Sequence, residues 1–278
     1  MKFERRNLNI EGINYAVRVH GKGKPLIALH GFSESAETWD LLDLPGYQIF
    51  AIDLLGHGQT DKPRAREPYR ISPLLHALDL LIKALIGDQS FVLLGYSMGG
   101  RLALRYCLTY PQASVSSLIL ESTGPGLNSA KERDDRRKAD EKLAENIMEK
   151  GPIWFADFWG NLGLFSSQKH LSESLQAQIW QRRASNSPHA LANTLAGTGQ
   201  GELTSVADQI DTLPYKLLYL SGDLDKKYTQ LGAEVFAPCQ NVQVITVPDC
   251  GHNIHLENLA LYNHIVREFL MGHCAFMI

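Results

Sequence analysis

Apolar residues along this chain gather in short runs that are separated by longer stretches of helical character. Short apolar runs that end in turn residues and alternate with helices are typical of a parallel sheet that is covered on both faces. The pattern therefore predicts an α/β architecture. Six runs mark the expected strands: PLIALHGF (25–32), QIFAIDLLG (48–56), SFVLLGY (90–96), SSLILEST (116–123), KLLYLSGD (216–223) and VQVITVPDCGH (242–252).

The alternation stops between Leu120 and Leu217, where no strand-like run occurs. We expect helices there, and the charged piece KERDDRRKADEKLAENIMEK (131–150) is typical of a solvated helix face. The next piece, GPIWFADFWGNLGLF (151–165), carries more aromatic area than one amphipathic helix needs, so it packs helices onto the core or lines a pocket beneath them. We therefore interpret the chain as a core of residues 1–122 and 205–278 with an inserted helical cap, residues 123–204.

Composition narrows the range of partners and compartments. The formal net charge of the 278 residues is −3 and no block of Lys and Arg stands apart from its acids, so we expect no nucleic-acid partner. No apolar run approaches the roughly 20 residues that cross a bilayer, and the first ten residues lack signal-peptide features, so we expect no membrane role. The cysteines have neither metal-ligand nor disulfide-framework spacing, which favours reduced thiols, no metal and a cytoplasmic protein. They are Cys107, Cys239, Cys250 and Cys274.

The segment GYSMGG (95–100) stands where an expected strand must turn into a helix that we predict from Met98 to Tyr110. Its first five residues fit G-x-S-x-G with Ser97 at the centre. In that motif a strained turn exposes the serine oxygen, and small flanking residues let strand and helix approach each other. A tight turn whose serine caps the helix would explain the same letters. The motif alone leaves both interpretations open.

A serine nucleophile needs a base, and the base needs an orienting acid, each at the carboxyl end of a strand. Two later strand ends supply these groups in the order Ser, Asp, His, which is the chain order of an α/β-hydrolase. KLLYL is followed by Asp223 and Asp225, and VQVITV is followed by Gly251 and His252. We predict that His252 is the base and that His255 packs or bonds locally. Either aspartate could be the acid, and the other would be a turn carboxylate bonded to its own backbone.

The first expected strand ends in the loop HGFS, which can hold an oxyanion. In an α/β-hydrolase, one amide of that loop and the amide after the nucleophile donate to the same oxyanion. We therefore expect the backbone N–H groups of Phe32 and Met98 to form an oxyanion hole. The side chain of His30 is expected to bond neighbouring loops. DLLGHGQTD (53–61) has neither G-x-x-x-x-G-K-[ST] nor G-x-G-x-x-G, so we predict a structural turn there and no phosphate site.

Together HGFS, DLLGHGQTD, GYSMGGRLAL, SGDLD and CGHNIHLEN resemble the α/β-hydrolase superfamily over nearly the whole core. Within it, GYSMGGRLALRY, LILESTGPGL, ERDDRRKADE, PIWFADFW, QRRASN and HNIHLEN are similar to the 2-succinyl-6-hydroxy-2,4-cyclohexadiene-1-carboxylate synthases of menaquinone biosynthesis. The resemblance implies the α/β-hydrolase fold, a mostly parallel sheet flanked by helices with the inserted cap. It also selects Asp225, at the end of a G-x-x-D turn, as the acid.

The resemblance implies a lyase that works without a cofactor. Its substrate would be the tricarboxylate 2-succinyl-5-enolpyruvyl-6-hydroxy-3-cyclohexene-1-carboxylate, from which it eliminates pyruvate. Ser97 would then act as a base and form no acyl-enzyme. The residues leave two alternatives open: a serine hydrolase of esters, thioesters or carbon–carbon bonds, and a non-catalytic ligand receptor on the same fold.

Arginines separate this lyase from an esterase built on the same residues. Arg101 lies four residues after Ser97, one helical turn along the same face. If Arg101 is buried there, withdrawing its guanidinium from water costs several kcal/mol unless an anion pairs with it. A substrate carboxylate would be such an anion. By position in their motifs, the resemblance implies five further substrate-binding residues. They are Tyr96, Arg136, Phe158, Trp159 and Arg183, where Phe158 and Trp159 replace the Trp-Tyr pair that the family can carry.

Overall fold

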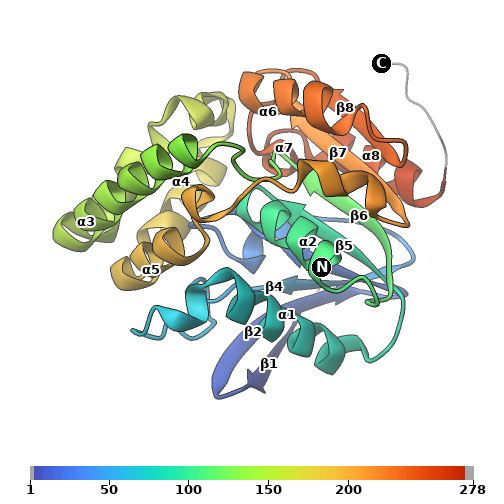
Figure 1. The fold of residues 1–278 in the computed structure, drawn as a ribbon, viewed down its shortest axis with the longest axis horizontal. Helices are drawn as coiled ribbons and strands as arrows, with labels where there is room; N and C mark the ends of the chain where they lie inside the picture. Colours follow the sequence, from blue (N-terminus) through green and yellow to red (C-terminus); the bar gives the residue numbers. More distant parts are fainter. Residues whose placement is uncertain (1–2, 273–278) are drawn as a thin grey trace.

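The computed structural model describes residues 3–272 (Figure 1). They form an eight-stranded sheet in the order β1-β2-β4-β3-β5-β6-β7-β8. From β4 to β8 in that order each neighbouring pair is parallel, so the carboxyl ends of these strands meet at one edge. They coincide with the predicted runs, which confirms the α/β architecture. The strands are β1 (Glu4–Ile10), β2 (Ile13–Gly21), β3 (Lys24–Leu29), β4 (Tyr47–Ile52), β5 (Phe91–Tyr96), β6 (Val115–Glu121), β7 (Lys216–Gly222) and β8 (Val242–Val247).

Strands β1 and β2 extend one edge of the sheet in antiparallel pairing and were not predicted from the apolar pattern. Most residues of β1, ERRNLNI, are exposed or half-buried. An edge strand of an antiparallel pair can face water, so it needs no continuous apolar run. The prediction therefore missed these strands because their pattern differs from that of the buried parallel strands.

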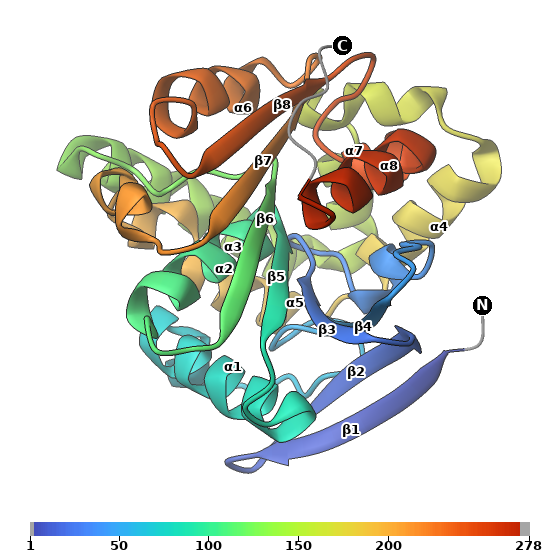
Figure 2. The ribbon, with the colours of Figure 1, turned by 90° about the vertical axis from the view of Figure 1, so that its right-hand side faces the viewer.

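Helices cover both faces of the sheet, with α1 and α2 on one side and α8 on the other (Figure 2). Along β3, Ile27 and Leu29 join the apolar cluster that includes α1 and α2, whereas Leu26 and Ala28 join the cluster that includes α8. Successive side chains thus enter opposite cores, which explains why β3 is apolar along nearly its whole length. The segments around the sheet are η1 (Ala36–Trp39), η2 (Glu67–Tyr69), α1 (Ile71–Ile86), α2 (Met98–Thr109), α6 (Lys226–Leu231), η6 (Gly232–Phe236), α7 (Ile254–Glu257) and α8 (Leu259–Leu270).

The chain between β6 and β7 is helical, as predicted, and α3, α4 and α5 lie together at one side of the sheet (Figure 1). A β-bridge between Leu127 and Thr204 brings the two ends of this segment together. Helix α3 changes direction at Gly151, whose φ of 81° is left-handed and which is followed by Pro152. The segment contains α3 (Ala130–Gly160), η3 (Gly163–His170), α4 (Glu173–Ala184), α5 (Pro188–Thr198) and η4 (Gln200–Glu202), and η5 (Ala207–Thr212) follows it.

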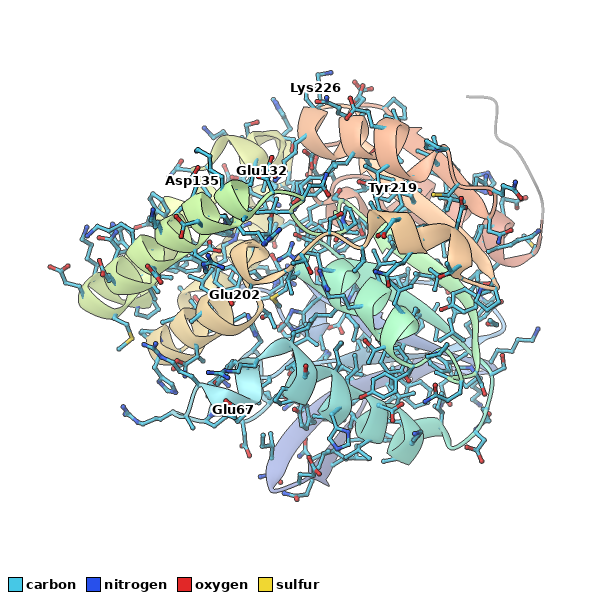
Figure 3. All side chains as sticks on the ribbon, viewed as in Figure 1. Glu67, Glu132, Asp135, Glu202, Tyr219 and Lys226 are labelled. Carbon is cyan, nitrogen blue, oxygen red and sulfur yellow. The ribbon has the colours of Figure 1, made fainter. Side chains whose placement is uncertain are left out.

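The charged first half of α3 has two different faces. Glu132 and Asp135 are exposed on its outer face (Figure 3), where Lys131 pairs with Asp135 one turn away at 2.6 Å. Arg136 bonds Asp140 at 2.8 Å, and the Asp140 side chain is buried. The predicted solvated face is confirmed for the outer side, while the opposite side turns charged groups toward the interior of the protein.

Three further observations concern the exclusions drawn from composition. Cys107, Cys239 and Cys250 are buried and unpaired, as predicted for reduced thiols, and Cys274 lies outside the described residues. Burial raises the pKa of Cys107 and of Cys250 to about 12, so both thiols keep their protons at neutral pH. Within residues 3–272 no helix has the length and apolarity needed to span a membrane.

Candidate active site

Ser97 forms a strained turn between β5 and α2. Its φ of 51° and ψ of −108° are rare for a residue with a side chain. A Cβ at Gly95 would overlap the carbonyl oxygen of Gly99, and a Cβ at Gly99 would overlap that of Leu29, so both positions require glycine for close helix–strand approach. The Ser97 side chain forms no capping hydrogen bond with α2. The interpretation of this serine as a helix cap is therefore wrong.

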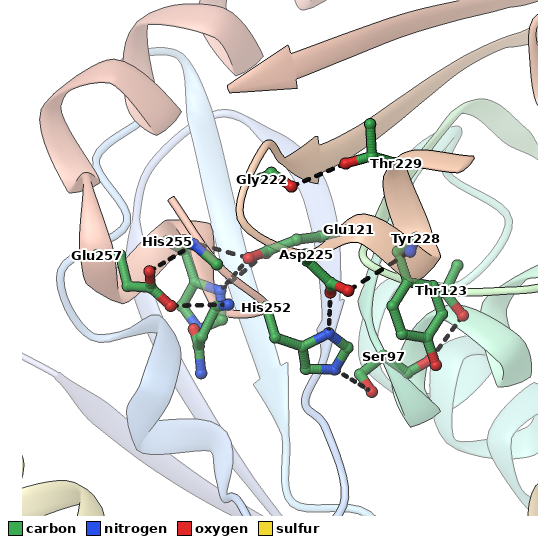
Figure 4. A network of polar contacts seen from close by, with 12 residues as sticks. Ser97, Glu121, Thr123, Gly222, Asp225, Tyr228, Thr229, His252, His255 and Glu257 are labelled. Carbon is green, nitrogen blue, oxygen red and sulfur yellow. Dashed lines mark hydrogen bonds and ion pairs between the residues drawn. The ribbon is translucent and has the colours of Figure 1, made fainter. Parts of the chain in front are cut away.

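Three strand ends bring Ser97, His252 and Asp225 into one hydrogen-bonded chain (Figure 4). His252 Nε2 lies 3.0 Å from Ser97 Oγ, and His252 Nδ1 lies 2.6 Å from Asp225 Oδ2. Because a carboxylate only accepts, Nδ1–H donates to Asp225, which leaves Nε2 free to accept the hydroxyl proton of Ser97. The imidazole is thus held in the tautomer that a general base at Ser97 requires.

The neighbouring candidates lie outside the Ser97–His252–Asp225 chain. Asp223 does not reach His252, and its buried Oδ1 has no hydrogen-bond partner among the described residues. His255 bonds Glu121 and Thr38, which lie 134 and 217 positions away in the sequence. His30 Nε2 accepts from the amide of Leu54 at 3.0 Å, which joins two neighbouring loops as predicted. The geometry therefore separates Asp225 and His252 from their neighbours in sequence.

The two expected oxyanion donors border the same cavity as Ser97. Met98 is the first residue of α2, so its amide has no partner within the helix and lies at the positive end of the helix dipole. Phe32 lies in the loop after β3, where a Cβ at Gly31 would stand 2.6 Å from the ring of Tyr96. The loop thus approaches β5 closely because residue 31 has no side chain.

A cavity of about 250 Å³ opens beside Ser97, between the sheet and the inserted helices. Its core side holds His252, Tyr96 and Arg101, and its other side holds Arg136 and residues of η3 and α5. Burial raises the pKa of Tyr96 well above that of a free phenol, so this residue presents a protonated hydroxyl. The cavity therefore offers a basic histidine together with hydrogen-bond donors and cations.

Arg101 is a buried charge at the cavity. The residue is 8% exposed and its Nε has no hydrogen-bond partner among residues 3–272. Burial lowers the pKa of Arg101, which records the cost of keeping this charge away from water. Arg136, in contrast, is bonded to Asp140. The structure buries Arg101 on the helix of the turn, and an anion in the cavity would compensate its charge.

The predicted aromatic pair divides between cavity and surface. Trp159 lines the cavity, packs edge-on against Phe32 at 5.4 Å, and has a buried Nε1 without a partner in the described part of the chain. Phe158 is 42% exposed and stacks on Trp154 at 5.0 Å, outside the cavity lining. Neighbours on a helix point about 100° apart, so one of two adjacent aromatic residues faces outward.

Arg183 is buried but does not reach the cavity wall. It donates to Gln168 Oε1 at 3.1 Å and lies 4.5 Å from the centre of the Phe165 ring. Phe165 borders the cavity on its other side, so this ring separates Arg183 from Ser97 and His252. The structure thus brings Tyr96, Arg101, Arg136 and Trp159 together at the cavity but not Phe158 and Arg183.

Lys227 lines the cavity and was not predicted from the sequence. Its Nζ lies 5.1 Å from the centre of the Tyr228 ring, whereas Lys226 Nζ donates to the carbonyl oxygen of Asp223. Two adjacent lysines after an acid carry no local signal of which one faces a cavity. The path of α6 after Asp225 decides it.

A family model described as the alpha/beta hydrolase fold matches residues 24–259, and the chain belongs to this family. That range contains Ser97, Asp225 and His252. The order of these residues along the chain and their positions at strand ends agree with this class of protein.

Full-length relatives narrow the family further. A Bacillus subtilis (strain 168) protein named "Putative 2-succinyl-6-hydroxy-2,4-cyclohexadiene-1-carboxylate synthase" is 37% identical over 94% of this chain and 96% of its own. The 2-succinyl-6-hydroxy-2,4-cyclohexadiene-1-carboxylate synthase of Shigella flexneri serotype 5b (strain 8401) is 31% identical over 89% of this chain and 95% of its own. The solved structure of MenH from S. aureus matches with a TM-score of 0.85 and 30% identity over 92% of this chain and 98% of that chain. The chain is a member of this synthase family.

Proposed function

We propose that this protein eliminates pyruvate from 2-succinyl-5-enolpyruvyl-6-hydroxy-3-cyclohexene-1-carboxylate and thereby makes 2-succinyl-6-hydroxy-2,4-cyclohexadiene-1-carboxylate for menaquinone biosynthesis. The observation that carries this proposal is Arg101, a buried arginine whose Nε has no hydrogen-bond partner among residues 3–272, in the cavity that also holds Ser97 and His252. A neutral ester would leave that charge unmet, whereas a tricarboxylate substrate meets it.

Ser97 acts as a base in the proposed reaction. His252, oriented by Asp225, accepts the hydroxyl proton of Ser97, and Ser97 Oγ takes the ring proton α to the succinyl ketone. The carbon–hydrogen electron pair forms an enolate, whose oxygen accepts hydrogen bonds from the amides of Phe32 and Met98. As the enolate collapses, a second ring double bond forms and the carbon–oxygen bond to the enolpyruvyl group breaks. The leaving group takes a proton and departs as pyruvate.

The substrate carboxylates are assigned to cations that border the cavity. We assign Arg101 and Arg136 to two of them, with Tyr96 and Trp159 as further contacts, and Lys227 offers a third cation. Phe158 and Arg183 remain predictions, because this arrangement keeps both from the cavity. We also propose that residues 123–204 act as a cap over the site and that the protein works in the cytoplasm, which its unpaired thiols support.

A coupled assay of pyruvate release, run beside hydrolysis of p-nitrophenyl acetate, tests the proposal. We expect pyruvate release by the wild type and by Ser116→Ala, a control in an exposed serine at the amino end of β6, and loss of release in Ser97→Ala. Intact mass after rapid mixing should show unmodified protein, because the substrate has no ester for Ser97 to cleave. Ester hydrolysis with an acyl adduct and without pyruvate would make the protein a serine hydrolase. Substrate that binds and stays unchanged would make it a receptor.

A further inference from the structure

A second carboxylate–imidazole pair lies beside the Ser97–His252–Asp225 chain (Figure 4). His255 Nδ1 lies 2.9 and 2.8 Å from the two carboxylate oxygens of Glu121, and the backbone amide of His255 donates to Glu121 Oε1 at 3.2 Å. The Glu121 side chain has no exposure to solvent. Neither residue borders the cavity, so this pair does not contact a ligand held there.

Burying this pair costs free energy. A carboxylate withdrawn from water costs several kcal/mol unless charges or hydrogen bonds replace its hydration. Both ring nitrogens of His255 are used, because Nε2 lies 2.7 Å from Thr38 Oγ1, and the ring stacks on Trp39 with centroids 4.3 Å apart. The ring therefore has one fixed position. A buried pair whose ring nitrogens and carboxylate are all bonded fixes the positions of the backbone segments that carry the two residues.

Glu121 forms hydrogen bonds both with the turn that carries Ser97 and with the segment that carries His252. It is the last residue of β6, and its carbonyl oxygen accepts from the amide of Ser97 at 2.9 Å. Its carboxylate holds the amide and the ring of His255, three residues after His252 on the same loop and helix. One residue thus links the backbone of Ser97 to the segment that carries His252.

The loop around His252 is also held from its other side. Glu257 accepts from the amides of Gly251 and Asn253 at 2.6 and 3.2 Å, so the amides on both sides of His252 bond one carboxylate. Glu257 and His255 both belong to α7. Glu121 therefore holds α7, and α7 in turn holds the loop of His252.

Tyr96 provides a third connection between the two pairs. Its ring lies edge-on to His255, with centroids 5.0 Å apart, and 5.4 Å from His252. The fixed His255 ring thus backs the Tyr96 ring, which packs against the base. A displacement of His255 would reach His252 through this contact as well as through α7.

We propose that Glu121 and His255 are positioning residues, which set the 3.0 Å separation of Ser97 Oγ and His252 Nε2 and the 2.6 Å contact of His252 with Asp225. They act on proton transfer and not on substrate affinity. The kinetic consequence rests on the function proposed above, while the geometric consequence does not.

The test uses Glu121→Gln and His255→Gln in the full-length protein. We expect kcat for pyruvate release to fall roughly 10- to 100-fold with KM changed less than about threefold, since small misplacements of reacting groups have effects of this size. Proton NMR of the free enzyme supplies a readout that does not depend on turnover. The low-field resonance of the His252 Nδ1 proton should shift or broaden in both variants.

His20→Gln is the matched control, because His20 is also buried and bonds a backbone carbonyl, that of Leu42, but it lies on β2. It should lower thermal stability while keeping kcat and the resonance. If the glutamine variants fold poorly, Thr38→Val, which removes only the Nε2 partner of His255, should shift the resonance the same way and lower kcat by a smaller factor. Variants that fold and keep both kcat and the resonance of the wild type would overturn the inference. If the wild type releases no pyruvate but the His252 resonance still shifts in the two variants, the proposed function is refuted and the positioning role stands.

Discussion

The two sides of the cavity are built differently. On the core side, Ser97, Asp225 and His252 follow the carboxyl ends of β5, β7 and β8 and are joined by hydrogen bonds of 3.0 and 2.6 Å. On the inserted side, Arg136 is carried by α3, a helix that is exposed over much of its length. Groups on strands packed into a core are held more rigidly than groups on a surface helix. We therefore expect the core to perform the chemistry and the inserted helices to contribute to recognition of the substrate.

Arginine shows the same contrast within one residue type. Arg101 in the core is buried and its Nε has no hydrogen-bond partner among the described residues, whereas Arg136 in the insertion is about one-third exposed and paired with Asp140. A ligand carboxylate replaces lost hydration at Arg101, but at Arg136 it competes with a partner that is already present. Arg101 should therefore contribute more to transition-state binding than Arg136.

The largest expected effect comes from breaking the core chain. Ser97→Ala, His252→Ala and Asp225→Asn should each lower kcat by on the order of 10³-fold or more, and double variants should lose little beyond the worst single one, because the three groups act as a unit. Steady-state pyruvate release measures this, with circular dichroism to verify folding. Asp223→Asn is the control and should keep activity. Severe loss in Asp223→Asn with little in Asp225→Asn would reverse the choice of acid.

The arginines come next. Arg101→Ala should lower kcat/KM by roughly 100- to 1000-fold and Arg136→Ala by roughly 10-fold, and Arg101→Lys should recover only part because an ammonium cannot form a two-pronged contact with a carboxylate. Arg101→Met should also raise the melting temperature, because it removes a buried guanidinium whose Nε has no hydrogen-bond partner among residues 3–272. Unchanged pyruvate release in both alanine variants would refute the tricarboxylate assignment.

Buried histidines of the core should make stability sensitive to acid. Burial lowers the pKa of His57 from 6.5 to about 3 and also lowers that of His30. Between those values the unfolded chain binds more protons, so the free energy of unfolding rises with pH and is lost as pH falls from about 6.5 toward 3. His57→Gln should reduce this slope by up to about 1.4 kcal/mol per pH unit. Urea unfolding of the wild type and of His57→Gln at several pH values measures it, and equal slopes for the two proteins would contradict the prediction.

The smallest effect is expected at the adjacent lysines. Lys227→Gln should raise KM several-fold and weaken the salt dependence of substrate binding, whereas Lys226→Gln, whose side chain bonds the Asp223 carbonyl, should match the wild type. KM measured across a range of salt concentrations compares the two variants. Equal KM values for both would remove Lys227 from the recognition surface.

The sequence by itself determined the parts of the molecule whose signals are local. The expected strands follow from apolar runs, the turn at Ser97 requires glycines around it, and the order serine, aspartate, histidine follows from which strand ends carry these residues. The choice of Asp225 over Asp223 needed the family resemblance as well. The position of Arg101, one turn after Ser97, singled it out as a candidate buried cation, and the structure buries it.

Tertiary structure alone decided which side chains of the surface helices reach the cavity. Phe158 and Trp159 are neighbours in sequence, yet one stacks on Trp154 at the surface and the other borders the cavity. Arg183 lies behind Phe165, and the pairing of Glu121 with His255 joins residues 134 positions apart. The physical reason is that the rotation of an exposed helix about its axis, and the meeting of distant loops, depend on packing against other elements, which no local pattern encodes.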